Sequence, residues 1–214
     1  MKPAKSLLTP EGSIVLFIDH EPQMYFGVTS HNQQCLKNNV VGLAKAAKVF
    51  NVETVLTTID AKTFSGLTIK ALTDALGTTE AIDRTTINSW EDAKVTAAVN
   101  KSGKKKLIIS ALWTELCALL PALSAKEEGY EVYVVADACG GATKESHDMA
   151  LQRMIQAGVI PVTWEQVMLE WQRDWAKKDT GKKVLQIATD HGGSYGIGIE
   201  YANSIAAGDV TPKN

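Results

Sequence analysis

Apolar runs that alternate with stretches of helical periodicity most strongly limit the folds open to this chain. The first run, residues 13–18, is almost unbroken and ends at Asp19, and a second covers residues 53–59. Such runs are typical of parallel strands covered on both faces, because a strand with one wet face alternates apolar and polar residues. Further strands are expected at 80–84, 104–110, 131–137 and 159–162, with helices at 33–50, 67–76, 91–100, 115–128 and 146–157.

This alternation predicts an α/β fold, a doubly wound (Rossmann-like) parallel sheet of about six strands with helices on both faces. The 214 residues fit one large domain better than two small ones. We assign residues 1–179 to this domain. Residues 180–214 hold six of the 16 glycines and no clear period apart from 184–188, so they are interpreted as an arm packed on the domain or on a neighbouring subunit.

Charge and cysteine content exclude several classes of protein. A net charge of −2 with scattered Lys and Arg gives no general attraction to nucleic acid or to an anionic membrane. No apolar run approaches membrane-spanning length, and residues 1–12 show no signal peptide. Three cysteines cannot all pair within one chain, which favours a reducing compartment. We therefore expect a cytoplasmic protein.

Cys117 follows the apolar run at 104–110 and is the candidate nucleophile. Thr114 and Glu115 can begin a helix by side-chain capping, which places Cys117 in its first turn, beyond the carboxyl edge of the sheet. Unpaired N–H groups at a helix start favour the thiolate over the thiol and can hold an oxyanion. Pro121 lacks an N–H group, so local irregularity is expected. The alternative is a small core residue, because free cysteine is usually buried.

An acid and a fixed cation are expected at the same edge of the sheet. Asp19 and Arg84 each end a predicted strand, and open α/β sheets bind ligands at the carboxyl ends of their strands. Asp19 can take a proton from the thiol and pass it to a leaving group, whereas Arg84 keeps its charge and can lower the thiol pKa. The alternatives are a capping carboxylate for Asp19 and a surface ion pair for Arg84.

The chain resembles the isochorismatase-like cysteine hydrolases, and within that family the YcaC-like branch. The similarity covers most of residues 12–176, with the matching stretches in the right order. Its most specific segment is Thr-Glu-Leu-Cys at 114–117. The other stretches, which are weak singly and strong jointly, include Val15–His20, Arg84–Trp90 and Val134–Ala138.

The resemblance implies a catalytic triad of Asp19, Arg84 and Cys117. It also implies a cis peptide bond before Trp113 and an oxyanion hole formed by the backbone N–H groups of Trp113 and Cys117. Two departures stand out. Arg84 occupies a position where most members have lysine, although the YcaC-like branch resembles this chain there, and Ala111 stands where glycine is common.

No metal or organic cofactor is expected. Nicotinamidases of this superfamily bind a metal through Asp-x-His after the second strand, where this chain has Asp60-Ala61-Lys62. The four histidines show no ligand spacing. The first strand is followed by residues 19–22 rather than a glycine-rich loop, which argues against a dinucleotide-dependent oxidoreductase. Residues 193–198 contain three glycines, but they neither follow a strong strand nor open a predicted helix.

These features predict a hydrolase that cleaves an amide or related acyl bond of a small molecule through a thioester on Cys117. Asp19 would act as general base and acid, and Arg84 as electrostatic partner. The alternative from another class is a binding or scaffold protein that has this fold and no turnover.

The pocket and the assembly are predicted with less detail. Phe26, Trp90 and Trp113 are candidate pocket walls, with core packing as the alternative for each. The resemblance implies a homo-oligomer, such as a tetramer or octamer. An aromatic stripe that suits either a core or a subunit interface is formed by Trp164, Met168, Trp171 and Trp175.

Overall fold

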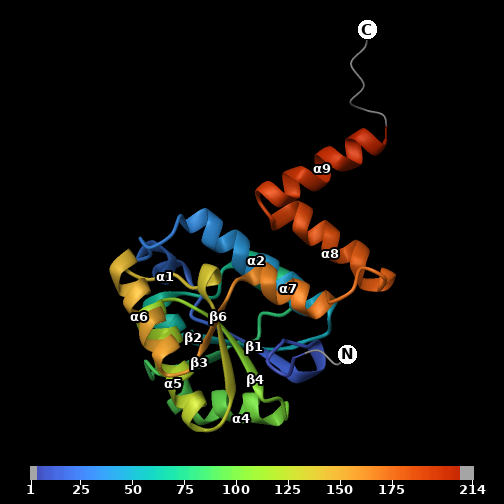
Figure 1. Ribbon diagram of the computed structural model, residues 1–214. Helices are drawn as coiled ribbons and strands as arrows, with labels where there is room; N and C mark the ends of the chain where they lie inside the picture. The colour runs from blue at the N-terminus through green and yellow to red at the C-terminus, as the bar shows by residue number, and fades with distance from the viewer. Residues whose placement is uncertain (1–3, 208–214) are drawn as a thin grey trace.

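The computed structural model describes residues 4–207 and contains a six-stranded parallel sheet (Figure 1). The strand order is β3-β2-β1-β4-β5-β6, so the chain builds outward from β1 on one side and then from β4 on the other. The predicted doubly wound, Rossmann-like α/β fold is confirmed. The strands are β1 (Ser13–Ile18), β2 (Glu53–Ile59), β3 (Ile82–Arg84), β4 (Lys106–Ala111), β5 (Glu131–Val135) and β6 (Ile160–Val162).

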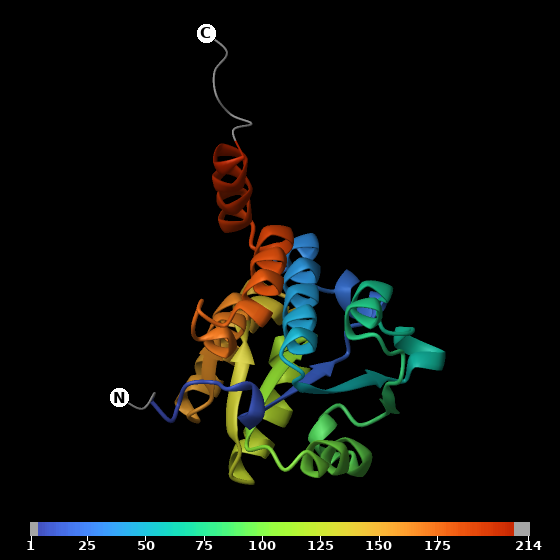
Figure 2. The same cartoon turned by 90° about the vertical axis from the view of Figure 1, so that its right-hand side faces the viewer.

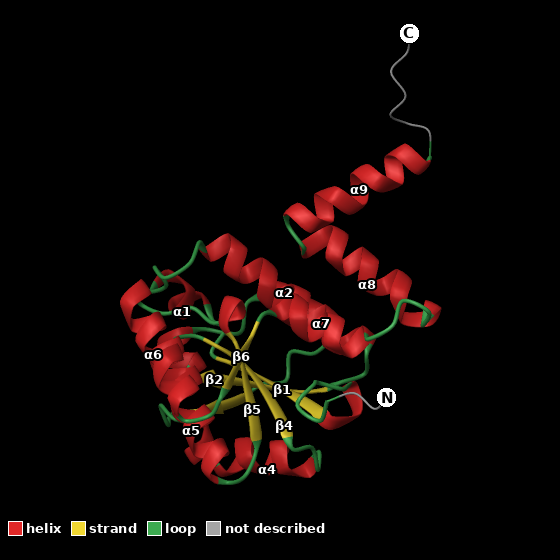
Figure 3. Cartoon of the chain, in the orientation of Figure 1, coloured by secondary structure: helices red, strands yellow, loops and turns green. Residues whose placement is uncertain are grey.

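Helices cover both faces of the sheet (Figures 2 and 3). Helices α2, α3, α7 and α8 enclose one apolar core, and α4, α5 and α6 enclose the other. Within residues 4–207, no helix combines the length and the apolar character needed to cross a bilayer. The helices are α1 (Pro22–Phe26), α2 (Gln33–Val49), α3 (Lys70–Leu76), α4 (Ala93–Lys101), α5 (Leu119–Glu127), α6 (Lys144–Gln156), α7 (Trp164–Gln172), α8 (Lys178–His191) and α9 (Ser194–Ala206). Short helical turns are η1 (Pro10–Gly12), η2 (Ala61–Ser65), η3 (Ser89–Glu91), η4 (Thr114–Ala118) and η5 (Ala136–Ala138).

Strand β1 shows why its apolar run is unbroken. All six of its residues are buried. Side chains along a strand point alternately to opposite faces of the sheet. Val15 and Phe17 therefore enter the core under α2 and α7, while Ile14, Leu16 and Ile18 enter the core under α4 and α5. A strand that feeds two cores leaves no face exposed to solvent, and Ser13 at its start is the one polar residue of β1.

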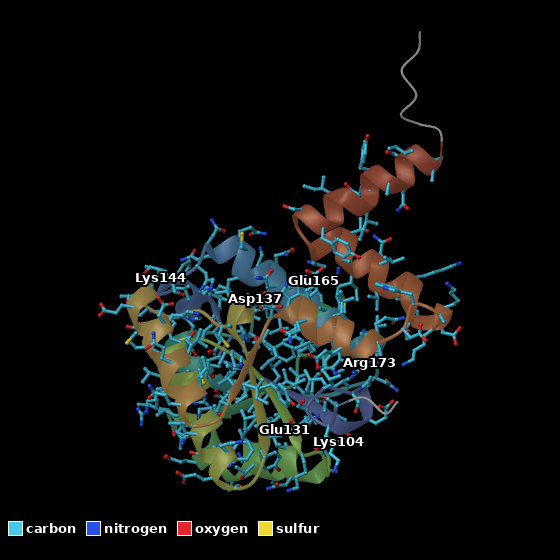
Figure 4. The ribbon with its side chains drawn as sticks, in the orientation of Figure 1. Lys104, Glu131, Asp137, Lys144, Glu165 and Arg173 are labelled. Carbon is cyan, nitrogen blue, oxygen red and sulfur yellow. The ribbon has the colours of Figure 1, made fainter. Side chains whose placement is uncertain are left out.

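Asp137 shows that a carboxylate just beyond a strand end is not always part of a site. Its Oδ1 accepts a hydrogen bond from the backbone N–H of Trp164 at 2.9 Å, so the carboxylate caps the start of α7. Figure 4 shows Asp137 near Glu165 at this end of α7. Burial raises the pKa of Asp137 to about 6, and the hydrogen bond from Trp164 opposes that rise.

Two short segments differ from the sequence-based prediction. Residues 22–26, where no helix was predicted, form α1, because Pro22 suits the first position of a helix. Helix α7 ends at Gln172 because Arg173 has a φ of 59°, so the predicted stripe breaks before Trp175, which is 45% exposed. The other three members of the stripe, Trp164, Met168 and Trp171, are buried in the core.

The region after residue 179 is helical. The sequence analysis found no clear period there apart from residues 184–188, so it did not predict these helices. Helix α8 (Lys178–His191) spans the expected domain boundary, and α9 (Ser194–Ala206) follows after Gly192 and Gly193. Residues 193–198 do open a helix, so that part of the sequence argument was wrong; they follow a helix and not a strand. Residues 208–214 of the predicted arm lie outside the described residues.

Candidate active site

The candidate site lies between β1 and β4, where the winding of the sheet reverses direction. Asp19 directly follows β1, and Cys117 lies in η4, shortly after β4. The backbone N–H of Leu112 donates to the carbonyl of Ile18 at 3.1 Å and so holds these two strand ends together. Open α/β sheets form their ligand-binding crevice at this point, beyond the carboxyl ends of the strands.

The turn that carries Cys117 is irregular, as Pro121 predicted. The Leu112–Trp113 peptide bond is cis, which agrees with the family resemblance. Residues Thr114–Ala118 then form one π-helical turn before α5 begins. The backbone N–H of Thr114 donates to the carbonyl of Gly140 at 3.0 Å, so the loop after β5 supports this turn.

Two further side chains hold the same turn in place. The Thr114 hydroxyl is hydrogen-bonded to Nδ1 of His147 on α6 at 2.8 Å, in a buried position. Glu115 Oε1 accepts from the backbone N–H of Ala142 at 2.9 Å. Thr114 is therefore anchored to α6 and Glu115 to the loop before α6, and Cys117 is carried on the turn that these contacts hold.

Asp19 and Arg84 form a fully buried ion pair. One terminal nitrogen of Arg84 donates to Oδ1 of Asp19 at 2.7 Å and to Oδ2 at 2.6 Å, and neither side chain is exposed to solvent. Arg84 Nε donates to the hydroxyl of Thr57 at 2.9 Å, and another terminal nitrogen contacts the carbonyl of Thr86. Asp19 has a φ of 58°, and its N–H donates to the carbonyl of Thr57 at 3.0 Å. The surface ion pair considered for Arg84 is thus replaced by a buried one.

Cys117 faces the Asp19 carboxylate and is itself buried. Burial raises the pKa of the Cys117 thiol well above its usual value, and the negative charge of Asp19 and a hydrogen bond to it act in the same direction. Arg84 and the backbone of Trp113 oppose that rise. The expectation of a thiolate favoured by a helix start was wrong for this chain, because loss of solvent and a facing carboxylate outweigh the helix start and the guanidinium. Burial therefore favours the thiol form of Cys117.

The Asp19 carboxyl is shifted by the same burial. Its pKa is raised by loss of solvent, while Arg84 and the Cys117 thiol lower it. A carboxyl group whose pKa moves upward is a stronger proton acceptor than a free aspartate. The thiol proton can therefore pass directly to Asp19 while both groups stay buried.

Glu21 is a second buried acid near this pair, and the sequence analysis did not single it out. Its Oε1 accepts from the N–H of Ile59 at 3.0 Å and from the hydroxyl of Ser65 at 2.9 Å, and Oε2 is buried without a hydrogen-bond partner. Burial and then the charge of Asp19 raise the pKa of Glu21 to about 8. The signal was its position two residues beyond Asp19, which was used only to reject a glycine-rich loop.

His20 is a structural neighbour of Asp19. Ser110 donates its hydroxyl proton to the carbonyl of Ala138 at 2.7 Å, so Nε2 of His20 must donate to Ser110 Oγ at 3.0 Å. Nδ1 of His20 is then free to accept from the hydroxyl of Tyr25 at 3.4 Å. Burial lowers the pKa of His20 to about 4, so the ring is neutral and connects β1, β4 and α1.

The three predicted pocket residues have different surroundings. Phe26 is 76% exposed at the end of α1. Trp113 lies over Gly27, the residue after Phe26, and the Trp113 Nε1 donates to the carbonyl of Met24 at 2.9 Å. Trp90 is buried in the same apolar core as Cys117, with its ring edge against Tyr130. Trp90 is thus packed in a core, and the pocket role of all three residues stays a prediction.

The remaining cysteines and the metal question are addressed by the same structure. Cys35 is exposed on α2, and Cys139 is fully buried with its sulfur accepting from the N–H of Ala111 at 3.3 Å. Among residues 4–207, no three His, Cys, Asp or Glu side chains are grouped so that they could hold a metal ion. Lys62 replaces the histidine of the nicotinamidase motif, and the absence of a catalytic metal stays a prediction.

The sequence and the fold agree with one family of proteins. The isochorismatase domain family matches residues 13–166. The chain therefore belongs to the isochorismatase family.

Within that family the chain is YcaC-like. It is 37% identical over 179 residues to a protein named probable hydrolase YcaC from Escherichia coli, covering 83% of this chain and 86% of that protein. The crystal structure of E. coli YcaC, described as an octameric hydrolase of unknown specificity, superposes with a TM-score of 0.88 and 33% identity over 96% of this chain and 100% of that chain. YcaC from Pseudomonas aeruginosa, solved with hexane-2,5-diol and covalent acrylamide, also gives a TM-score of 0.88 at 33% identity, over 94% of this chain and 100% of that chain.

Proposed function

We propose that this protein is a cysteine hydrolase that cleaves an amide or related acyl bond in a small molecule. The observation that carries this proposal is the buried set formed by the Cys117 thiol, the Asp19 carboxylate that faces it and the Arg84 guanidinium on that carboxylate. A thiol, a proton acceptor and a fixed cation beside one another are the groups that acyl transfer to sulfur needs.

The proposed reaction has two halves. As the Cys117 sulfur bonds to the substrate carbonyl carbon, the thiol proton passes to Asp19. The carbonyl oxygen gains a negative charge, and the backbone N–H groups of Trp113 and Cys117 can stabilise it by donating hydrogen bonds. The carbon–nitrogen bond then breaks, and the amine leaves with the proton from Asp19. Water attacks the resulting thioester and gives a proton to Asp19; the carboxylic acid departs, and sulfur recovers its proton.

Arg84 stabilises the ionised form of Asp19 in this scheme and does not carry protons. A guanidinium keeps its charge throughout the physiological range. It lowers the pKa of both Asp19 and Cys117 against the effect of burial. Without this charge, neither the carboxylate nor a transient thiolate would be stable at these buried positions.

The similar proteins support this proposal without naming a substrate. E. coli YcaC is called a probable hydrolase, and Pseudomonas YcaC was solved with covalent acrylamide, an electrophile to which thiols add. The Bacillus subtilis nicotinamidase PncA, at 14% identity and a TM-score of 0.61, shares the fold.

The test is a screen of small amides and carbamoyl compounds for release of amine or ammonia. Cys117→Ala should abolish turnover of any substrate found, while Cys139→Ala, which alters a second buried thiol, should retain it. Turnover that survives in the Cys117→Ala protein would reject the mechanism. If no compound is turned over although Cys117 can be alkylated, the alternative of a binding or scaffold protein is favoured.

We also propose that the chain assembles with copies of itself. E. coli YcaC is described as an octamer, and this chain matches 100% of its length at 33% identity. The test is light scattering, with a single species of 23.1 kDa as the result that rejects assembly.

A further inference from the structure

A cavity of about 440 Å³ lies between α2, the start of α7 and the end of α8. Helix α8 packs against both α2 and α7 (Figure 1), and the two glycines that link α8 to α9 complete the wall. The cavity is separate from the candidate active site, because Asp19, Arg84 and Cys117 do not line it. Its volume is in the range of pockets that hold small organic molecules.

The hydrogen bonds of His191, the last residue of α8, determine which ring nitrogen carries its proton. The amide nitrogen of Asn38 on α2 donates to the carbonyl of His191 at 2.8 Å. The amide oxygen of Asn38 must then accept from Nδ1 of His191, also at 2.8 Å. Burial and then the charge of Lys45 lower the pKa of His191, so the ring is neutral at pH 7 and Nε2 carries a lone pair. This nitrogen is buried, and no group of residues 4–207 donates to it.

Glu165, the second residue of α7, has another buried acceptor in the wall of the same cavity. Its Oε1 receives no hydrogen bond from the described part of the chain. A Cβ atom on Gly192 would lie 3.3 Å from this oxygen, so the carboxylate lies beside the residue that follows His191. The start of α7 is already capped by Asp137 and Thr163. Burial raises the pKa of Glu165, as expected for a carboxylate with no cation beside it.

The rest of the wall favours a cation that has an apolar body. Among the described residues no Lys or Arg lines the cavity, and Asp190 adds a second carboxylate, which is 3.7 Å from Lys45. Trp164 supplies an aromatic surface, which attracts positive charge and packs against carbon. A metal ion is not favoured, because residues 4–207 contain no group of three side chains that could hold one. An ammonium group offers both a positive charge and N–H donors.

We propose that this cavity binds a small primary alkylammonium cation. One N–H of the cation donates to Oε1 of Glu165 and another to Nε2 of His191, while the alkyl chain lies against Trp164. This site is additional to the proposed hydrolase reaction and does not depend on it. Because an amine is also the leaving group of that reaction, the experiment has to separate this cavity from the active site.

Calorimetric titration of the full chain with butylammonium chloride tests the proposal. Sodium butyrate and 1-butanol have the same carbon chain without the positive charge, and butyltrimethylammonium chloride keeps the charge without any N–H. We expect butylammonium to bind more tightly than each of the three by roughly tenfold or more, because both charge and donors are needed. Equal affinity for all four compounds, or no heat from butylammonium beyond that of sodium chloride, would overturn the proposal.

Two substitutions remove the acceptors one at a time. Glu165→Gln removes the charge and keeps the shape of the side chain, whereas His191→Asn removes Nε2 and keeps a donor for Asn38. Each should weaken butylammonium binding by roughly tenfold with an unchanged circular dichroism spectrum. The matched control is Glu127→Gln, the same change at an exposed position that ends α5, which should bind as the wild type does. Wild-type affinity in the Glu165 variant, or an equal loss in the control, would reject the site.

The cysteines show where the cation binds. Cys35 is exposed and lines the cavity, whereas Cys117 belongs to the candidate active site. Saturating butylammonium should slow the alkylation of Cys35 by iodoacetamide and leave that of Cys117 unchanged, which peptide mass spectrometry can follow. Protection of Cys117 in place of Cys35 would show that the amine binds as a reaction product, and it would overturn this proposal while supporting the hydrolase. A failed amide screen would leave these binding measurements unaffected.

Discussion

Asp19 has two opposite influences on the reactivity of Cys117, and substitution separates them. As a charge, it raises the pKa of the thiol; as a base, it removes the thiol proton. If the proposed mechanism holds, Asp19→Asn lowers the rate of Cys117 alkylation by acrylamide at neutral pH, by roughly tenfold or more, because general-base assistance is lost.

The control for this measurement is the exposed thiol. Cys35 should react at the same rate in the wild type and in the variant, because it lies on α2 outside the candidate site. A faster reaction of Cys117 after Asp19→Asn would mean that the carboxylate only suppresses ionisation, and it would contradict its role as base. Peptide mass spectrometry distinguishes the two sites.

Glu21 makes the stability of the fold depend on pH. Its carboxyl has a usual pKa of 4.5 and titrates near 8 in the folded protein. Between these values the folded state holds a proton that the unfolded chain has released, so the free energy of unfolding falls as pH rises from about 5 to 8. Glu21→Gln should remove this slope and stabilise the protein at pH 9 by on the order of 1–3 kcal/mol, with little effect at pH 4.

Urea unfolding across this pH range measures the effect. Glutamine keeps the acceptor that Glu21 offers to Ile59 and Ser65, so a loss of stability at all pH values would show that the assigned hydrogen bonds are wrong. The control is Glu145→Gln, an exposed carboxyl on α6 that should leave the pH dependence unchanged.

At the residue scale, the sequence predicted which groups the structure brings together, but not their ionisation. Asp19, Arg84 and Cys117 could be found because each follows a recognisable strand, and parallel strands end at a common edge. The thiol pKa could not be predicted, because its main cause is burial, which depends on packing from the whole domain. Glu21 was overlooked for the same reason: in the sequence nothing distinguishes its buried oxygen from a solvated one.

At the scale of elements, the end of α1 and the turn after β4 are joined by one close contact. A Cβ atom on Gly27 would lie 2.3 Å from Cζ2 of Trp113, inside the indole ring's contact distance. Gly27→Ala should therefore displace Trp113 and lower the free energy of unfolding by about 1–3 kcal/mol, as overpacking does. Tryptophan fluorescence and urea unfolding measure the two effects.

Gly198→Ala provides the matched control for this prediction. A Cβ atom at Gly198 meets nothing within 4 Å, and alanine favours a helix over glycine. This variant should be as stable as the wild type or slightly more so. Equal stability of the Gly27 and Gly198 variants would show that Trp113 can move at no cost.

The elements themselves differed in how well the sequence predicted them. Strands such as β1 and β4 were predicted closely because their residues are apolar on both faces. Helix α9 was missed because Gly196 and Gly198 argue against a helix, and the close packing that requires Gly196 is not visible in a sequence. The aromatic stripe was drawn too long, because Trp175 fits the spacing but follows the break at Arg173.

At the scale of the whole molecule, assembly should link stability to concentration. If copies bind through the folded state, dilution favours dissociation and lowers the melting temperature. We expect the melting temperature to fall by several degrees over a hundredfold dilution. Scanning calorimetry and fluorescence at several concentrations measure this, and a melting temperature that does not depend on concentration would contradict it.

The short edge strand β3 gives the Asp19–Arg84 pair a second consequence. Only three residues of β3 pair with β2, so the backbone alone holds it weakly. Arg84, the last residue of β3, extends past β2 and pairs with Asp19 at the end of β1, which ties the edge strand to the centre of the sheet. Deuterium uptake at the backbone amides of residues 82–84 should therefore report on the Arg84 guanidinium. A bound molecule that draws this guanidinium away from Asp19 would speed exchange at these amides without contacting them.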